Sequence, residues 1–263
     1  MNNAPIGVYD SGFGGLSVWR ELHRMLPHES LVYLGDGKNC PYGGRSRQEI
    51  ATFAFAAVER LIAEGAKMVV VGCNTATTAA IKELREAWPT MPIVGLEPAV
   101  KPACLTSVKR RIAVLATEHS LRSDMFLDTA ARYAADVEVL KVVGKGFVEI
   151  VESDAEATPE AMAAVRHVVE PLLAKEVDKI VLGCTHYPFL KPQIRQIVDG
   201  HGIDIIDSGE AVARRVEWLL DRYDIAASED NVADYRFLSF ADEEYRRRLE
   251  AKANKILLHD ITL

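Results

Sequence analysis

Short apolar runs alternate along this chain with longer amphipathic segments. The runs are rich in β-branched residues, and we interpret seven of them as strands: 6–9, 31–34, 68–71, 92–95, 111–116, 137–143 and 179–182. Helical patterns cover 16–26, about 46–63, 74–87, 159–173 and the tail from 209 onward. Ser46 and Glu49 have the spacing of a capping box, and Pro159 follows Thr158 as it does at a helix start. Strands that alternate with helices predict parallel sheets with helices on both faces.

The order of these elements repeats in the second half of the chain. The run at 111–116 precedes a polar turn as the run at 6–9 does, and 137–143 corresponds to 31–34. Ile6 and Ile112 lie 106 positions apart, and Cys73 and Cys184 lie 111 apart. We therefore expect an α/β protein of two pseudo-symmetric, doubly wound domains with the active site in the crevice between them. The first domain would comprise 1–97 plus 208–263, whose C-terminal helices pack back, and the second 98–207.

Composition narrows the class of protein. The chain has 263 residues, of which 49% are hydrophobic, and a net charge of −7. We expect no direct binding to nucleic acid, because affinity for phosphates needs a basic surface. No apolar stretch approaches the ~20 residues that span a bilayer, and the N-terminus lacks the pattern of a signal peptide. We expect a cytoplasmic protein without a membrane partner, in which the four cysteines are free thiols.

Two segments are nearly alike and carry the most informative chemistry. Residues 67–75 read KMVVVGCNT, and residues 179–186 read KIVLGCTH. Cys73 and Cys184 therefore lie just past a strand, where an open α/β sheet builds its ligand crevice. A helix N-terminus there would stabilise the thiolate, lower the pKa of the thiol and make it a nucleophile or a base. The residues that follow could hold a carboxylate: Asn74, Thr75, Thr185 and His186.

Two other interpretations of these cysteines must be weighed against a pair of reactive thiols. Each thiol could be a small buried residue without chemistry, because free cysteine is among the most buried residue types. The matched polar residues after both cysteines favour a functional pair instead. Cys184 and His186 could also supply two zinc ligands, but no second Cys/His pair at metal-site spacing accompanies them, so no metal site is expected.

Polar residues also follow the first two predicted strands. Asp10 and Ser11 open the turn DSGFGG, which matches neither a dinucleotide-binding nor a phosphate-loop motif. Asp10 could bind an ammonium group or orient a base. Asp36 and the segment CPYGG at 40–44 have the composition of turns. The hydroxyl of Tyr42 and the backbone N–H groups beside it could line the crevice.

Five of these motifs together resemble a known family. They are DSGFGGL at 10–16, PYG at 41–43, GCNT at 72–75, GCTHYP at 183–188 and IDSG at 206–209. The chain resembles the glutamate racemase family of the aspartate/glutamate racemase superfamily over about residues 6–220. The resemblance implies racemisation of glutamate without a cofactor, with two thiols on opposite faces of the α-carbon. It also implies that the D-glutamate produced supplies peptidoglycan and cell-wall synthesis.

The resemblance implies a role for each motif residue. Cys73 would deprotonate D-glutamate with help from Asp10, and Cys184 would deprotonate L-glutamate with help from His186. Substrate contacts are implied for Asp10, Ser11, Tyr42, Gly43, Asn74, Thr75, Thr185 and His186. Supporting roles are implied for Asp36, Thr117, Ser120 and Glu152.

The chain departs from the family pattern at two positions beside the site. His119 lies within the segment that usually reads Thr-x-x-Thr, and Glu149 replaces a usual proline. The alternatives are a racemase of another amino acid, such as aspartate, and a regulatory role such as gyrase inhibition. A one-cysteine decarboxylase is disfavoured because both thiols are present. We expect a homodimer.

Overall fold

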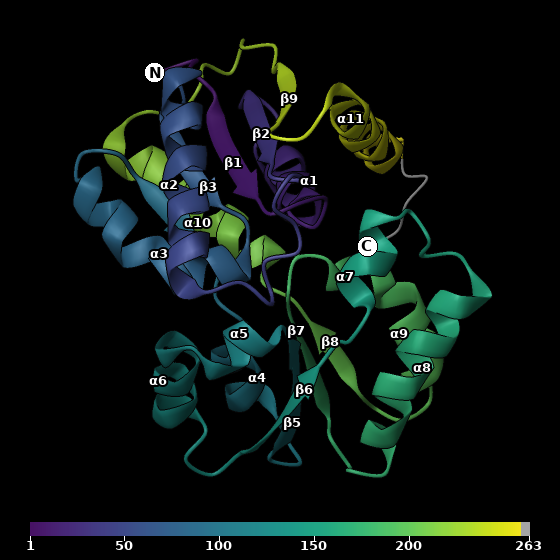
Figure 1. Ribbon diagram of the computed structural model, residues 1–263. Coiled ribbons are helices and arrows are strands. Elements are labelled where there is room, and N and C mark those ends of the chain that lie inside the picture. Colours follow the sequence, from purple (N-terminus) through teal and green to yellow (C-terminus); the bar gives the residue numbers. More distant parts are fainter. Residues whose placement is uncertain (259–263) are drawn as a thin grey trace.

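The computed structural model describes residues 1–258 and contains two parallel β-sheets with helices packed on their faces (Figure 1). The first sheet has the order β4-β3-β1-β2-β9: β1 (Ile6–Asp10), β2 (Leu31–Gly35), β3 (Met68–Val71), β4 (Ile93–Gly95) and β9 (Tyr235–Ser239). The second has the order β6-β5-β7-β8: β5 (Arg111–Ala116), β6 (Glu138–Val143), β7 (Lys179–Gly183) and β8 (Asp204–Ile206). Every strand pair is parallel, so the predicted α/β class is confirmed.

The two sheets share one topology. The order β4-β3-β1-β2 in the first sheet corresponds to β8-β7-β5-β6 in the second. Tyr9 of β1 pairs with Val71 of β3, and Ala116 of β5 pairs with Gly183 of β7. Both cysteines follow within two residues of the strands β3 and β7, so each lies at the carboxyl edge of its sheet, where such folds bind ligands.

The helices connect the strands and cover both faces of the sheets. They are α1 (Leu16–Met25), α2 (Arg47–Ala63), α3 (Asn74–Ala87), α4 (Val100–Thr106), α5 (Glu118–Arg122), α6 (Asp124–Tyr133), α7 (Phe147–Glu152), α8 (Pro159–Leu173), the 3-10 helix η1 (Tyr187–Leu190), α9 (Lys191–Val198), α10 (Gly209–Tyr223) and α11 (Glu243–Leu257). Ser46 and Glu49 form the predicted capping box of α2. Thr158 caps α8, and Pro159 is its first residue, as predicted. No helix within residues 1–258 is long and apolar enough to cross a membrane.

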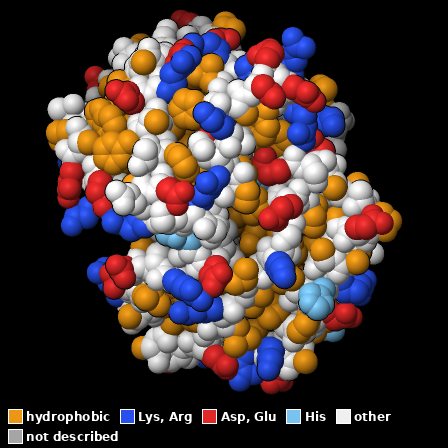
Figure 2. Space-filling model, in the orientation of Figure 1, with side chains coloured by type: hydrophobic (Ala, Val, Ile, Leu, Met, Phe, Trp, Pro, Cys, Tyr) orange, Lys and Arg blue, Asp and Glu red, His pale blue; other side chains and the backbone are white. Residues whose placement is uncertain are grey.

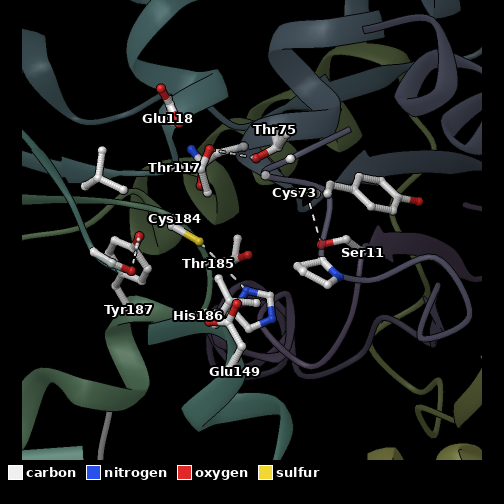
Figure 3. Close-up of a pocket in the computed structure, with 18 of the residues that line it drawn as sticks. Ser11, Cys73, Thr75, Thr117, Glu118, Glu149, Cys184, Thr185, His186 and Tyr187 are labelled. Carbon is white, nitrogen blue, oxygen red and sulfur yellow. Dashed lines mark hydrogen bonds between the residues drawn. The ribbon is translucent and has the colours of Figure 1, made fainter. Parts of the chain in front are cut away.

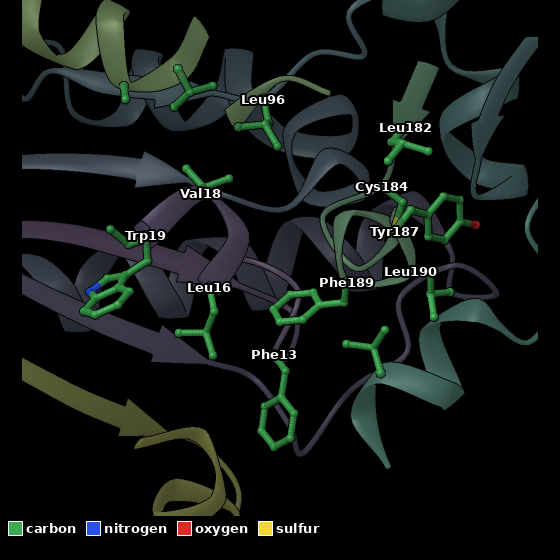
Figure 4. Packing of buried hydrophobic residues seen from close by; sticks show 14 of the residues in the cluster. Phe13, Leu16, Val18, Trp19, Leu96, Leu182, Cys184, Tyr187, Phe189 and Leu190 are labelled. Carbon is green, nitrogen blue, oxygen red and sulfur yellow. The ribbon is translucent and has the colours of Figure 1, made fainter. Parts of the chain in front are cut away.

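Both faces of the first sheet are buried. Val8 and Val70 belong to a cluster with α1, α10 and α11, whereas Tyr9 and Val69 belong to one with α2 and α3. Strands buried on both faces have continuous apolar sequences, which is why these runs were recognisable. The first cluster continues into the second half of the chain, where Figure 4 shows its residues packed around the carboxyl edge of β7: Leu182, Cys184, Tyr187, Phe189 and Leu190.

The prediction of a helical tail from Gly209 onward extends over 259–263, which lie outside the described residues. Within the described tail, residues 224–242 between α10 and α11 are not helical, so the prediction is wrong there, most clearly at 235–239. These residues form β9, which pairs in parallel with β2 at the edge of the first sheet. Phe237 is buried in the core there, and the Ser239 hydroxyl donates a hydrogen bond to the carbonyl oxygen of Gly35. The open edge of β2 supplies backbone partners that no local sequence pattern reports. Helix α11 then follows this strand.

Candidate active site

A cavity of about 280 Å³ lies at the carboxyl edges of the two sheets, and both candidate thiols line it. On the surface, a notch separates the parts of the molecule that carry the two sheets (Figure 2). Figure 3 shows Cys73 and Cys184 approaching the cavity from different sides. Ten of the predicted site residues line this cavity: Ser11, Tyr42, Gly43, Cys73, Asn74, Thr75, Thr117, Cys184, Thr185 and His186.

Cys73 caps the N-terminus of α3. Its Sγ accepts a hydrogen bond from the Ala76 N–H at 3.4 Å and donates one to Ser11 Oγ at 3.5 Å. Burial nevertheless raises the pKa of the Cys73 thiol to about 12, with the Asp10 charge as a second cause of this rise. The predicted lowering of this pKa is therefore wrong. Desolvation outweighs the helix N-terminus, so Cys73 carries its proton here.

Cys184 has a different environment. No α-helix begins at this cysteine, because the 3-10 helix η1 starts three residues later at Tyr187. Its Sγ lies 3.8 Å from His186 Nδ1. His186 Nε2 in turn hydrogen-bonds to Glu152 Oε1 at 2.6 Å. Thiol, imidazole and carboxylate thus form a chain in which the carboxylate orients the ring, as in other nucleophile–histidine pairs.

In this row of contacts, His186 and Glu152 each favour the charged form of the other. Burial alone would lower the pKa of His186, but hydrogen bonds with Cys184, Cys40 and Glu152 outweigh it and raise that pKa well above its usual value. Burial alone would raise the pKa of Glu152, but His186, the Phe13 N–H and the Tyr245 hydroxyl outweigh it and lower that pKa. An imidazolium that faces a carboxylate is the favoured state of this pair.

Asp10 lies behind the cavity wall and is fully buried. Its Oδ1 accepts from the Gly12 N–H at 2.8 Å, and its Oδ2 accepts from the Thr185 hydroxyl at 2.9 Å. Burial raises the pKa of Asp10 to about 6, although the His186 charge and these two donors oppose the rise. Among the described residues Asp10 makes no hydrogen bond to Cys73, so it acts on that thiol through its charge.

Three other predicted residues lie behind the wall, and each bonds to a residue that lines the cavity. Asp36 accepts from the Tyr42 hydroxyl at 2.6 Å. Ser120 shares hydroxyl contacts with Thr75 and Thr117 at 3.5 Å and 3.0 Å. Glu152 holds His186 as described. The supporting roles predicted for these residues are therefore compatible with their positions.

The glycines of the first turn are required by close approach between the two halves of the chain. A Cβ atom at Gly12 would overlap the carboxylate of Glu152, and one at Gly14 would overlap His186 Nδ1 and Thr185 Oγ1. Ser17, on the helix that follows, donates to the Thr185 carbonyl oxygen at 3.0 Å. The turn is therefore part of the wall against which the His186 segment packs.

Comparison with known proteins agrees with this geometry. The family model for Asp/Glu/Hydantoin racemase matches residues 6–216. The glutamate racemase of Ectopseudomonas mendocina is 45% identical over 229 residues, which are 87% of each chain. The chain belongs to this racemase family.

Solved structures of the racemase family have the same fold. The Escherichia coli glutamate racemase, in complex with L-glutamate and the activator UDP-MurNAc-ala, aligns with a TM-score of 0.85 and 30% identity, over 96% of this chain and 95% of that one. The Francisella tularensis glutamate racemase, in complex with D-glutamate, aligns with a TM-score of 0.83 and 26% identity, over 96% and 94%. The family match and the structural alignments thus establish both the family and the fold of this chain.

One group of side chains near the family motifs has the donor types of a metal site. Ligand atoms of Cys40, Glu152 and His186 lie within 4.8 Å of one another. Two ligands of one tetrahedral zinc ion are about 3.3 Å apart, given bonds of about 2.0 Å. His186 Nε2 and Glu152 Oε1 are only 2.6 Å apart, which is the separation of a hydrogen-bonded pair. The arrangement thus fits an acid–base pair better than a metal centre.

Sequence reasoning missed several residues at the site. Lys145 and Tyr187 line the cavity, and Glu149, noted only as a departure from the family pattern, lines it too. Tyr187 follows directly after His186, so its position was a usable signal. Tyr245 bonds to Glu152 from 93 positions away, and nothing in the local sequence indicates that contact.

Proposed function

We propose that this protein interconverts L-glutamate and D-glutamate by a two-thiol acid–base mechanism that needs no cofactor. The observation that carries this proposal is the presence of Cys73 and Cys184 in one cavity, each supplied by a different sheet. Racemisation needs a base on one side of the α-carbon and an acid on the other, which a single residue cannot easily provide. The glutamate bound in the two solved relatives supports the choice of substrate.

In the direction from L- to D-glutamate, Cys184 is the base and Cys73 is the acid. Glu152 holds the ring of His186, whose Nδ1 lies 3.8 Å from Cys184 Sγ, so a positive charge on this ring faces the thiolate that the reaction uses. This thiolate takes the α-proton as the Cα–H bond breaks and an S–H bond forms. The thiol of Cys73, whose raised pKa keeps it protonated, then gives its proton to the opposite face of the carbon. The net charge of the site is unchanged, because the thiolate has moved from Cys184 to Cys73.

In the reverse direction the two thiols exchange roles. The thiolate of Cys73 is stabilised by the Ser11 hydroxyl and the Ala76 N–H. Asp10 carries the charge that acts most strongly on this thiol, and its pKa of about 6 lets it hold or release a proton near neutral pH. We assign Asp10 to support proton transfer at Cys73 and His186 to support it at Cys184.

Binding of the substrate carboxylates needs donors that face the cavity. Asn74 Nδ2 is buried and has no hydrogen-bond partner among the described residues, which makes it such a donor. Asn74 and Thr75 also begin α3, whose free N–H groups favour an anion. A carbanion beside a carboxylate is stabilised by donors that are already in place before the reaction. We propose that Asn74, Thr75, Thr185 and the backbone at Gly43 hold the substrate.

We further propose that the chain divides into two domains, 1–97 plus 208–263 and 98–207, that move to admit substrate. Strand β9 joins the first sheet, and α10 shares a core with α1, which supports this division. The two proposed boundaries lie together, because the Ser208 hydroxyl donates to the Glu97 carbonyl oxygen at 2.5 Å. Two connections between domains that lie side by side can act together as a hinge.

The proposed product, D-glutamate, would serve peptidoglycan synthesis and so the construction of the cell wall. A homodimer and a cytoplasmic location remain predictions for this chain. The first can be measured by light scattering at several protein concentrations. The second can be measured by fractionation of the cells that produce the protein.

Exchange in D₂O tests the proposed mechanism. The purified protein is incubated with L-glutamate, or separately with D-glutamate, without any added cofactor. Circular dichroism should show loss of chirality, and proton NMR should show loss of the α-proton signal. Cys73→Ala and Cys184→Ala should each abolish racemisation. Cys104→Ala is the matched control, because Cys104 is a buried free thiol on α4, outside the cavity.

Two results would overturn the proposal. Full racemase activity in either Cys73→Ala or Cys184→Ala would exclude the two-thiol mechanism. Faster turnover of aspartate than of glutamate under the same conditions would exclude the choice of substrate. Equal loss of activity in the Cys104→Ala control would indicate damage to the fold rather than to the site.

A further inference from the structure

We propose that Tyr245, on the C-terminal helix α11, is a positioning residue for the Cys184 half of the reaction. Its hydroxyl holds the Glu152 carboxylate so that this carboxylate can hold the His186 ring against Cys184. This inference rests on the proposed function, because it assigns the residue to one of the two proton transfers. It concerns a part of the chain that lies outside the residues 6–216 matched by the family model.

The contacts form an unbroken chain from α11 to the thiol. The Tyr245 hydroxyl donates to Glu152 Oε2 at 2.8 Å. The other carboxylate oxygen, Oε1, accepts from the Phe13 N–H at 2.6 Å and bonds to His186 Nε2 at 2.6 Å. His186 Nδ1 is 3.8 Å from Cys184 Sγ. Both oxygens of Glu152 are thus fixed, one from each side, and the rotation of the carboxylate is set by Tyr245.

The ring of Tyr245 is itself held in place. It packs against Phe13, with 4.8 Å between the ring centroids. A Cβ atom at Gly37 would overlap the Tyr245 ring, so the backbone of the loop after β2 also packs against this ring. A tyrosine packed between a turn and a loop has little freedom, so its hydroxyl is a fixed donor.

Helix α11 is fastened to the segment that carries Glu152. Lys252 is 2% exposed and donates to the Val151 carbonyl oxygen at 2.9 Å, to Asp154 at 2.9 Å and to Glu156 at 2.5 Å. Arg248 donates to the Glu152 carbonyl oxygen at 2.6 Å. Helix α11 comes after strand β9 of the first sheet in the sequence. Its side chains nevertheless bond to the end of α7, which belongs to the second half of the chain. A change in the spacing of the two halves would move Tyr245 relative to the Glu152 carboxylate.

Isotope effects can separate this role from a structural one. A racemisation equilibrium constant is one, so a variant must lower kcat/KM equally in both directions. The step that limits the rate can still differ between directions. In Tyr245→Phe, slower transfer at Cys184 should enlarge the primary isotope effect with α-deuterated L-glutamate. It should reduce the effect with α-deuterated D-glutamate, whose proton is taken by Cys73.

The experiment compares wild type, Tyr245→Phe and Tyr235→Phe. Tyr245→Phe keeps the ring and its contact with Phe13 and removes only the hydroxyl. Tyr235→Phe is the matched control, because it removes another hydroxyl of the C-terminal segment, one that contacts His23 at 2.8 Å away from the cavity. We expect kcat/KM to fall about 10- to 150-fold in Tyr245→Phe, the effect of losing one hydrogen bond to a charged group. The control should stay within about twofold of wild type, the range of a substitution remote from the site.

A second measurement does not depend on turnover. The proton shared by His186 Nε2 and Glu152 should give a low-field NMR signal in wild type, which moves in Tyr245→Phe and stays in Tyr235→Phe. If wild type does not racemise glutamate, the proposed function fails, and this signal alone decides the inference. Unchanged isotope effects together with an unmoved signal in Tyr245→Phe would overturn it. A fall in melting temperature without these changes would show a structural role only.

Discussion

Asp10→Asn should make the protein more stable and less active. Asp10 is fully buried and accepts hydrogen bonds from the Gly12 N–H and the Thr185 hydroxyl. An asparagine can keep both contacts, because its Oδ1 can accept from Gly12 and its Nδ2 can donate to the Thr185 oxygen. The substitution therefore removes a buried negative charge while the packing and the hydrogen bonds of the site are retained.

The magnitude follows from the pKa of Asp10. Burial raises this pKa from 3.8 to about 6. The folded state therefore binds a proton that the unfolded state releases between these two values, so stability falls as pH rises through this window. The full penalty, about 3 kcal/mol at 1.36 kcal/mol per pH unit, is present above about pH 6. At pH 4.5 only about 1 kcal/mol of it has developed.

Urea denaturation of wild type and Asp10→Asn at several pH values measures this penalty. The free energy of unfolding of the variant should exceed that of wild type by about 1 kcal/mol at pH 4.5 and about 3 kcal/mol at pH 7. Racemase activity should fall by about 10²-fold or more, the usual loss of a group that assists proton transfer. A difference in stability that does not grow with pH, or a variant less stable than wild type at pH 7, would refute the reasoning.

Asp178→Asn is the control variant, because its effect on the free energy of unfolding should have the opposite sign to that of Asp10→Asn. Asp178 accepts from the Ser107 hydroxyl and from the N–H groups of Val108 and Lys109. Burial would raise its pKa, but these donors outweigh burial and lower it. Its contribution to stability is therefore present at neutral pH and is lost as pH falls. Asp178→Asn should be less stable than wild type at pH 7, and the deficit should shrink in acid.

Three further variants test the packing of the fold. Gly14→Ala should lower kcat/KM by about 10²-fold or more, since its Cβ atom would displace His186, and a wild-type rate would contradict the close approach. Lys252→Met should lower the free energy of unfolding by about 1–2 kcal/mol, because it removes the buried ammonium group that pairs with Asp154 and Glu156, while Arg248 still pairs with Asp154. Ser46→Ala should cost about 1 kcal/mol in the same denaturation assay through loss of the α2 cap, and an unchanged midpoint would show that the cap contributes nothing.

Most of the fold could be predicted from local patterns in the sequence. The central strands are buried on both faces, so each reads as an apolar run, and the capping residues of α2 and α8 mark where those helices begin. The repeated Gly-Cys endings located both thiols at strand ends, and the parallel pairing of β1 with β3 and β5 with β7 placed them at the sheet edges. Such signals are readable because strand burial and helix capping depend on neighbours within a few residues.

Only the tertiary structure decided how the two thiols differ. Burial raises the pKa of Cys73 against the effect of the helix N-terminus, while Cys184 stands beside His186 and has no α-helix of its own. The partners that shape this asymmetry come from far along the chain: Asp10 meets Thr185, and Tyr245 meets Glu152. Strand β9 escaped prediction for the same reason, since the open edge of β2 completes it. The hydrophobic periodicity of a segment indicates which of its own residues are buried. Desolvation and long-range hydrogen bonds depend instead on which elements come into contact in the folded chain.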